Sequence, residues 1–213
     1  MNFFGHSVIC GALVQDLEII LGSMLPDFAT MAGVRLPASL SPAIKAGIDL
    51  HHRTDSVFHR APQFVAMMAD TMEKLEDAGL ARGPARATAH VGIELLLDGL
   101  LASDPSRVHT YRSALTIGNR IAELSEAQDQ SWIQSLILRL QQAPLPHGYE
   151  SPEFVAGRVE YILQSRPRLR LEASHMEHVC DVLHGVQNKL RPIEADLMLH
   201  LTTQVSAMDV SID

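Results

Sequence analysis

Apolar residues recur three and four positions apart along nearly the whole chain, and no segment sustains the strict alternation of apolar and polar residues that marks a half-buried strand. A repeat of about 3.6 residues places apolar side chains on one face of a helix, where they can pack against other helices. The sequence therefore predicts an all-α protein built as a helical bundle.

Prolines, glycines and capping residues mark the ends of about eight expected helices. Ser41-Pro42 and Ser151-Pro152 each combine an N-cap residue with a proline at the first helical position, and Gly79 follows the end of an apolar periodic segment. The expected helices cover residues 5–25, 42–50, 62–79, 84–101, 105–124, 130–142, 152–163 and 177–205.

The length of 213 residues suits one domain of generous size or two small ones. No internal repeat or low-complexity linker divides the chain, so we expect a single helical domain over residues 1–213. The proline-rich turn 143–148 is the one candidate for an internal seam, and a loop inside one bundle is the alternative. The chemically interesting residues fall in 1–101.

The overall charge excludes some classes of function. Seventeen Lys and Arg against 25 Asp and Glu give a formal charge of −8, which argues against a general nucleic-acid binder. A hydrophobic content of 46% is too high for a disordered chain. The sequence contains no apolar run long enough for a transmembrane segment and no basic leader, and its two cysteines fit a reducing compartment, so a cytoplasmic protein is expected.

His51, Asp55 and His59 are spaced four residues apart. On a helix, this spacing would place two imidazoles and a carboxylate on one face. Neutral imidazole and carboxylate together suit a borderline divalent cation such as Zn, Mn or Fe. The alternative is an ordinary solvated helix face.

His90, Glu94 and Asp98 form a second series with the same spacing. The two acids are embedded in a leucine-rich run, where burying them without a partner or a metal would be costly. If the two series face each other across a pair of helices, they would form a metal site inside the bundle.

Asp27 and His6 are further candidate ligands. Asp27 follows Pro26, where the apolar helix is expected to break, and a carboxylate on such a turn can reach into a bundle. The alternatives are a turn or N-cap aspartate and a hydrogen-bonded histidine. Four later residues lack the spacing of a known metal motif and are expected on a solvated face, namely His175, His178, Cys180 and His184.

Several of these segments resemble the acyl carrier protein phosphodiesterase family. Residues 1–6, Met-Asn-Phe-Phe-Gly-His, are similar to the family's Met-Asn-Phe-Leu-Ala-His, and residues 22–28 resemble its Gly-Asn-Leu-Leu-x-Asp-Phe. Residues 47–55 resemble its Gly-Ile-x-x-His-Arg-x-Ile-Asp segment, Asp98 falls in its Trp-Asp-His element, and residues 166–169 resemble a short late element.

The resemblance implies an all-helical fold like that of the HD phosphohydrolases, and hydrolysis of the phosphodiester that joins 4'-phosphopantetheine to a serine of holo acyl carrier protein. It also implies a divalent metal, manganese before zinc or iron, surrounded by His6, Asp27, His51, Asp55 and Asp98. Two positions depart from the family pattern: Gly99 stands where the family has a histidine, and His52 where it has an arginine.

The remaining polar residues suggest catalytic roles. His59, His90 or Glu94 could act as general acid or base, because an imidazole titrates near neutral pH. Arg53 could neutralise a phosphate oxygen or form a surface ion pair.

Two other functions stay open from the sequence alone. One is a phosphohydrolase for a lipid or another small phosphodiester, because the Leu-Pro-Asp element at residues 25–27 is also similar to one in phospholipase C-like proteins. The other is an inactive interaction module. The sequence gives no indication of the oligomeric state.

Overall fold

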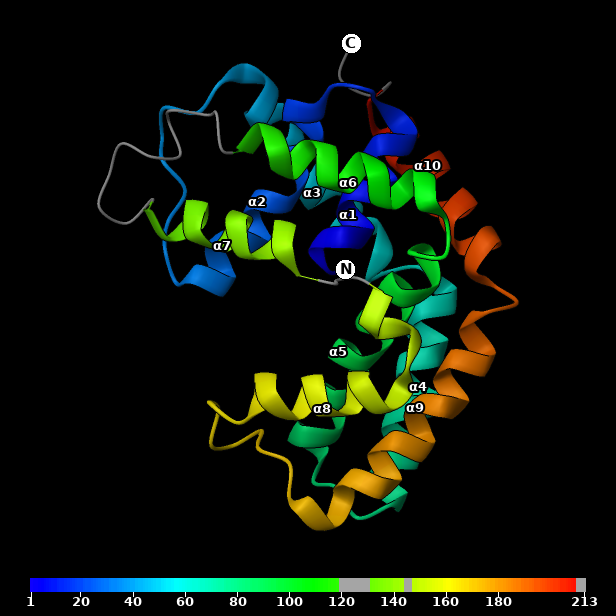
Figure 1. Cartoon of the computed structure of the whole chain (residues 1–213). Helices are drawn as coiled ribbons and strands as arrows, with labels where there is room; N and C mark the ends of the chain where they lie inside the picture. Colours follow the sequence, from blue (N-terminus) through cyan, green and yellow to red (C-terminus); the bar gives the residue numbers. More distant parts are fainter. Residues whose placement is uncertain (119–130, 144–146, 210–213) are drawn as a thin grey trace. The chain divides into compact units, whose positions relative to one another are not determined.

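The computed structural model describes residues 1–118, 131–143 and 147–209 (Figure 1). Within these residues it contains ten α-helices and no strand, which confirms the all-α prediction. The elements are α1 (Phe3–Leu13), α2 (Leu17–Ala32), α3 (Pro42–Phe58), α4 (Pro62–Asp77), α5 (Arg82–Leu101), α6 (Pro105–Gly118), α7 (Ser131–Gln142), η2 (His147–Glu150), α8 (Pro152–Leu163), η3 (Ala173–His175), α9 (Met176–Leu190) and α10 (Glu194–Asp209).

Ten helices replace the eight expected because two of the expected helices are each divided in two. The last apolar segment is interrupted around Pro192, which lies between the end of α9 and the start of α10 and cannot donate a helical hydrogen bond. The segment 5–25 is interrupted before Asp16, whose carboxylate caps α2 by accepting hydrogen bonds from the backbone N–H groups of Glu18 and Ile19 at 2.8 and 3.4 Å. The expected helix 105–124 is α6 as far as Gly118, and the rest lies outside the described residues.

This cap gives a stability prediction. Asp16→Ala is expected to lower the free energy of unfolding by about 1 kcal/mol, because two N–H groups at the start of α2 lose their acceptor. Asp16→Asn keeps an acceptor oxygen and should stay close to wild type. Urea denaturation of the three proteins measures the difference, and an alanine variant as stable as the asparagine variant would contradict the capping role.

Pro26 does not end a helix, contrary to the sequence prediction, because α2 continues through it to Ala32. A proline inside a helix costs about 3 kcal/mol. Contacts of α2 with α1, α3, α6 and α7 outweigh that cost, since they bury the helix on several sides. Asp27 therefore projects from the body of a helix and not from a turn.

The helices form two compact units. The first contains Met1–Phe58, Asp104–Leu145 and Met198–Asp213, and the second contains His59–Ser103 and Pro146–Leu197. Part of the turn 143–148, the candidate seam, lies outside the described residues. No helix in the described part of the chain is both long and apolar enough to cross a membrane.

In the first unit, α2 is the central element and packs most closely on α3 (Figure 1). A Cβ atom at Gly22 would overlap the backbone carbonyl of Ile44, and one at Gly47 would overlap that of Ile19. Only glycine permits this backbone contact between the two helices. The contact brings the backbone carbonyl of Ser23 in α2 within 2.9 Å of Nδ1 of His51 in α3.

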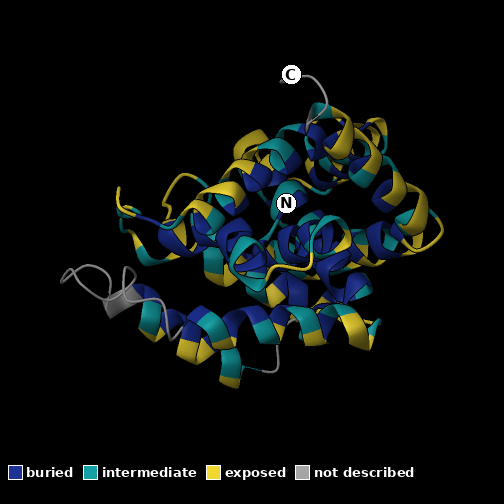
Figure 2. Cartoon of the chain, turned by 90° about the horizontal axis from the view of Figure 1, so that it is seen from above, coloured by how far each residue is buried: buried dark blue, intermediate teal, exposed yellow. Residues whose placement is uncertain are grey.

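In the second unit, α5 packs against α4, α8, α9 and η2. Its buried residues lie on nearly every side of the helix, including Leu95, Leu96, Leu97 and Asp98. Other helices at the surface carry buried residues on one face and exposed residues on the other (Figure 2). Any polar side chain on the buried part of α5 must therefore find its partners inside the protein.

Candidate metal centre

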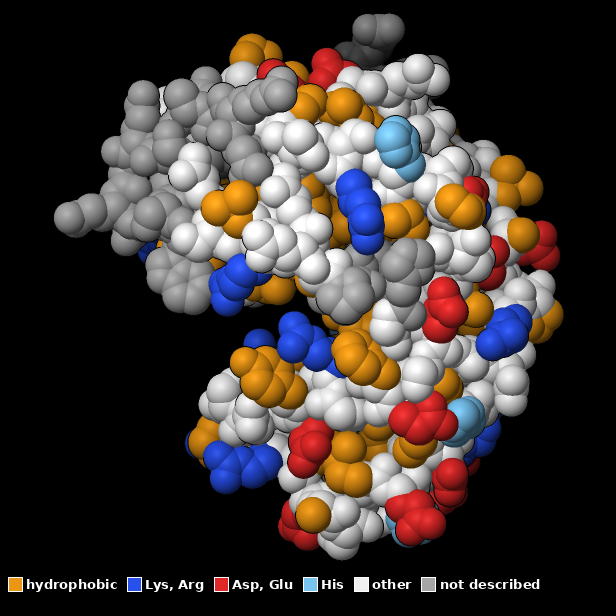
Figure 3. Space-filling model, in the orientation of Figure 1, with side chains coloured by type: hydrophobic (Ala, Val, Ile, Leu, Met, Phe, Trp, Pro, Cys, Tyr) orange, Lys and Arg blue, Asp and Glu red, His pale blue; other side chains and the backbone are white. Residues whose placement is uncertain are grey.

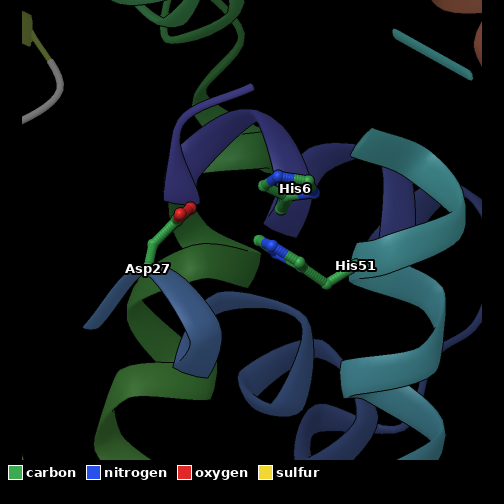
Figure 4. Close-up of side chains that lie close together, drawn as sticks. All are labelled: His6, Asp27 and His51. Atoms are coloured by element: carbon green, nitrogen blue, oxygen red, sulfur yellow. The ribbon is translucent and has the colours of Figure 1, made fainter. Parts of the chain in front are cut away.

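Three helices of the first unit bring together one side chain each from His6, Asp27 and His51 (Figure 4). One possible ligand atom of each residue lies within 4.8 Å of the corresponding atoms of the other two. His6 and His51 are buried and Asp27 is half-buried. These three residues are 21 and 24 positions apart in the sequence, so only the packing of α1, α2 and α3 joins them.

A backbone carbonyl fixes the orientation of His51. Its Nδ1 lies 2.9 Å from the carbonyl oxygen of Ser23. Since a carbonyl can only accept, Nδ1 carries the proton and Nε2 keeps its lone pair for a ligand. Burial lowers the pKa of His51 to about 4, although the bond to Ser23 and the nearby Asp55 oppose that shift. The imidazole is therefore neutral at pH 7, as metal binding requires.

His6 lies directly beside His51. The two rings stack with their centroids 3.9 Å apart and an interplanar angle of 29°. The His6 side chain has no exposed area, and its Nε2 lies 3.9 Å from Oδ1 of Asp55. The same Asp55 oxygen accepts a hydrogen bond of 3.0 Å from the amino group of Met1. Asp55 thus borders the three-residue cluster through His6.

Aromatic packing positions the helix segments that carry His6 and Asp27. Phe28, next to Asp27, is fully buried and its ring lies 5.5 Å from that of Phe3. Tyr111 of α6 contacts both Phe3 and Phe4, with ring centroids 6.1 and 5.3 Å apart. This aromatic core ties the start of α1 to the middle of α2.

The spacing of His51, Asp55 and His59 predicted that the three residues share one helix, and this prediction is wrong. The helix α3 ends at Phe58, and His59 lies in the turn that follows. In the second unit, His59 forms a cluster with His90 and Glu94, whose possible ligand atoms lie within 4.8 Å of one another. Their expected roles as acid or base stay predictions.

Asp98 is fully buried on α5, one turn after Glu94. No metal-ligand cluster found among the described residues includes it. Its carboxylate interacts electrostatically with Tyr149: burial raises the pKa of the Tyr149 hydroxyl, Arg158 lowers it by charge and by a hydrogen bond, and Asp98 raises it. The ligand role of Asp98 that the resemblance implies stays a prediction.

Arg53 lines a pocket of about 280 Å³ in the first unit, together with apolar residues of α1, α2 and α3. None of His6, Asp27 and His51 lines that pocket. The phosphate-binding role expected for Arg53 stays a prediction.

The late histidines lie on α9 and just before it. His178 and His184 are exposed and Cys180 is half-buried. Possible ligand atoms of Cys180, His184 and Glu153 lie within 4.8 Å of one another, so the purely solvated face expected from the sequence stays a prediction. The sequence analysis did not consider Glu153 of α8, whose Oε1 lies 2.6 Å from Nε2 of His184.

Comparison with known protein families shows to which family the chain belongs. The family model described as acyl carrier protein phosphodiesterase matches residues 1–193 of the 213. The chain belongs to the acyl carrier protein phosphodiesterase family. The name of the family denotes a phosphodiester hydrolase that acts on acyl carrier protein. The searches of curated proteins and of solved structures found no match, so the relation to the HD fold stays a prediction.

The structure shows why position 99 of this chain is a glycine. A Cβ atom at position 99 would overlap the backbone carbonyl of Tyr149 and lie 2.7 Å from the backbone nitrogen of Glu150. The segment η2 therefore occupies the space that a side chain would need. In the second unit, the packing of η2 on α5 therefore requires a glycine at position 99.

The depressed pKa of His51 predicts a pH dependence of stability for the metal-free protein. The unfolded chain binds the proton with an ordinary pKa near 6.5 and the folded chain only near 4. As the pH falls from about 6.5 to about 4, the unfolded state is increasingly favoured, and this contribution to stability, fully present above pH 6.5, is lost. By pH 4.5 the loss should reach about 2 to 3 kcal/mol.

Urea denaturation at pH 7 and pH 4.5, with a chelator present, measures this loss. Because carboxylates also titrate in this range, the informative quantity is the difference in pH dependence between wild type and His51→Gln. Equal pH dependence in the two proteins would show that His51 is not a buried neutral imidazole.

Proposed function

We propose that this protein hydrolyses the phosphodiester between 4'-phosphopantetheine and the serine of a holo acyl carrier protein, using a divalent cation held by His6, Asp27 and His51. The observation that supports this most directly is the convergence of three ligand atoms from three helices within 4.8 Å. The family relationship supplies the substrate class.

The donor set fits a divalent cation. Two imidazoles and one carboxylate suit manganese, zinc or iron, with manganese the ion we expect from the family resemblance. His51 is neutral and directs Nε2 away from Ser23, whose carbonyl holds Nδ1. A backbone carbonyl is one of the common partners for the second ring nitrogen of a metal-bound histidine.

The protein residues prepare the site for a phosphodiester. When bound, the cation would supply Lewis acidity towards a phosphate oxygen and towards water. The burial of His6 and His51 keeps bulk water away from the ligand atoms and strengthens electrostatic interactions there. Asp55, with Oδ1 3.9 Å from Nε2 of His6, can orient that imidazole or accept a proton. Hydrolysis adds water across the P–O bond, leaving a serine hydroxyl and phosphopantetheine.

A carrier protein must also dock. The net charge of −8 is unfavourable for an acidic partner, so docking requires a local basic area. The face drawn in Figure 3 carries both Lys or Arg and Asp or Glu side chains, with hydrophobic side chains between them. Local arginines, and not the overall charge, would then attract the carrier protein.

The experiment is release of phosphopantetheine from holo carrier protein, followed by mass spectrometry of the carrier. Protein stripped of metal should be inactive, and addition of Mn²⁺, Zn²⁺ or Fe²⁺ should restore conversion to apo carrier. A generic aryl phosphodiester serves as the comparison substrate. Hydrolysis of the aryl ester without any action on the carrier would favour a small phosphodiester substrate, and inactivity on both with every metal would favour an interaction module.

A further inference from the structure

The second unit contains a cluster that the proposed function does not use. His59 lies in the turn between α3 and α4, and His90 and Glu94 lie one turn apart on α5. His59 Nε2 is 3.1 Å from His90 Nε2, His90 Nε2 is 3.0 Å from Glu94 Oε1, and His59 Nε2 is 3.5 Å from the same oxygen. One atom of each residue therefore lies within 3.5 Å of one atom of each of the other two.

With Glu94 ionised, no arrangement of ring protons makes all three contacts attractive. If both Nε2 atoms carry a proton, both can donate to Glu94, but the two donors then face each other at 3.1 Å. If only one carries a proton, it can bond the other ring, and the lone pair of that ring faces the carboxylate oxygen. A cation between the three atoms would accept a lone pair from each and make all three contacts favourable.

The size of the triangle fits a transition metal. Metal–ligand bonds of about 2.0–2.1 Å place neighbouring ligand atoms about 2.9 Å apart in an octahedron and about 3.3 Å apart in a tetrahedron. The observed separations of 3.0, 3.1 and 3.5 Å lie at or close to these values. Two histidines with one carboxylate are also the ligand set of several catalytic zinc sites and of facial iron sites.

Phe64 covers one side of the cluster, and the cluster remains partly exposed to solvent. The ring of Phe64, a buried residue of α4, packs edge-on against both imidazoles, at 5.3 Å from His59 and 5.7 Å from His90. The side chains of His59 and His90 are 31% and 37% exposed and that of Glu94 is 13% exposed. An ion could therefore enter from solvent and keep coordination positions for water or another ligand.

We infer that His59, His90 and Glu94 bind a zinc-class divalent ion, in addition to the ion proposed at His6, Asp27 and His51. Zinc is favoured over manganese or magnesium here because two of three ligands are imidazoles. A histidine whose lone pair holds a cation cannot transfer a proton. We therefore propose metal binding for these three residues in place of the acid–base role that the sequence suggested.

The test is metal stoichiometry in four proteins: wild type, Asp27→Asn, Glu94→Gln and the double variant. Each is stripped with a chelator and titrated with Zn²⁺ by calorimetry, and with Co²⁺ while visible absorption is recorded. Wild type should bind two ions, each single variant one, and the double variant none with comparable affinity. Glu94→Gln should weaken the second site at least about 100-fold, because it removes the only anionic ligand.

Controls separate ligand loss from misfolding. Glu94→Gln has nearly the shape of wild type, and circular dichroism should show an unchanged helix content. His178→Ala, an exposed histidine of the same unit outside every cluster, should keep both ions. If Glu94→Gln still binds two ions, or if Asp27→Asn binds none, the second site does not exist. If instead Asp27→Asn keeps two ions while Glu94→Gln loses one, the proposed catalytic centre fails and the second site stands.

Discussion

Asp27→Asn is expected to reduce phosphodiester hydrolysis at least about 1,000-fold, equivalent to about 4 kcal/mol of lost transition-state stabilisation. Asp27 is the only carboxylate in the cluster with His6 and His51. Asparagine has almost the same shape but no charge, so it would hold a divalent cation much more weakly. The measurement is kcat/KM on holo carrier protein together with the metal content of the purified variant.

The loss of activity and of bound metal should be specific to the Asp27 carboxylate. Asp49→Asn makes the same chemical change on an exposed residue of α3 that belongs to no cluster, and it should retain wild-type activity and metal. Asp27→Asn should also keep its helix content and melting temperature, because Asp27 lies at the edge of the core. Full metal content and turnover in the Asp27 variant would refute the proposed centre.

Raising the concentration of Mn²⁺ adds a second readout. If Asp27 is a ligand, excess metal should recover part of the lost activity, because the two imidazoles remain. If Asp27 acted only on the substrate, more metal would change nothing.

Local signals in the sequence predicted most helix boundaries. Ser151-Pro152 begins α8 and Pro62 begins α4, as their capping and proline chemistry requires. The turn containing His59 could also have been anticipated. A residue before proline disfavours the helical conformation, so Pro62 makes it unfavourable for α3 to continue through Ala61.

The grouping of the site residues could not be predicted from spacing alone. The i, i+4 rule joins residues of one helix, and it correctly pairs His90 with Glu94. It says nothing about Asp27 reaching His6 and His51 from another helix. The Ser23 carbonyl that orients His51 is a backbone group, whose role depends on the close approach of α2 and α3 and leaves no mark in a side-chain pattern.

The roles of Gly22 and Gly47 could not be predicted from the sequence. Gly22 and Gly47 lie within apolar periodic segments, where a glycine ordinarily costs about 1 kcal/mol relative to alanine. Both are required by backbone contacts between helices, which depend on the tertiary fold.

Gly99→His, which restores the histidine of the family pattern, is expected to destabilise the protein by more than about 4 kcal/mol, well above the usual cost of overpacking. The Cβ atom alone would overlap the backbone of Tyr149, and a backbone cannot rotate away as the end of a side chain can. The neighbouring Asp98, which is fully buried, would be displaced with it. Denaturation in guanidinium chloride measures the loss, and Gly99→Ala should already show most of it.

Three alanine substitutions in the second unit provide a graded control. Gly157 of α8 has no neighbouring atom within 4 Å, so Gly157→Ala should stabilise the protein by about 0.5 to 1 kcal/mol through helix propensity. At Gly92 the new Cβ would meet only the end of the Leu183 side chain, at 2.5 Å, and the cost should be intermediate. The expected order of stability is therefore Gly157→Ala, then Gly92→Ala, then Gly99→Ala. If Gly99→Ala were as stable as Gly157→Ala, the chain would have room for the family histidine, and the packing of η2 on α5 would not account for its loss.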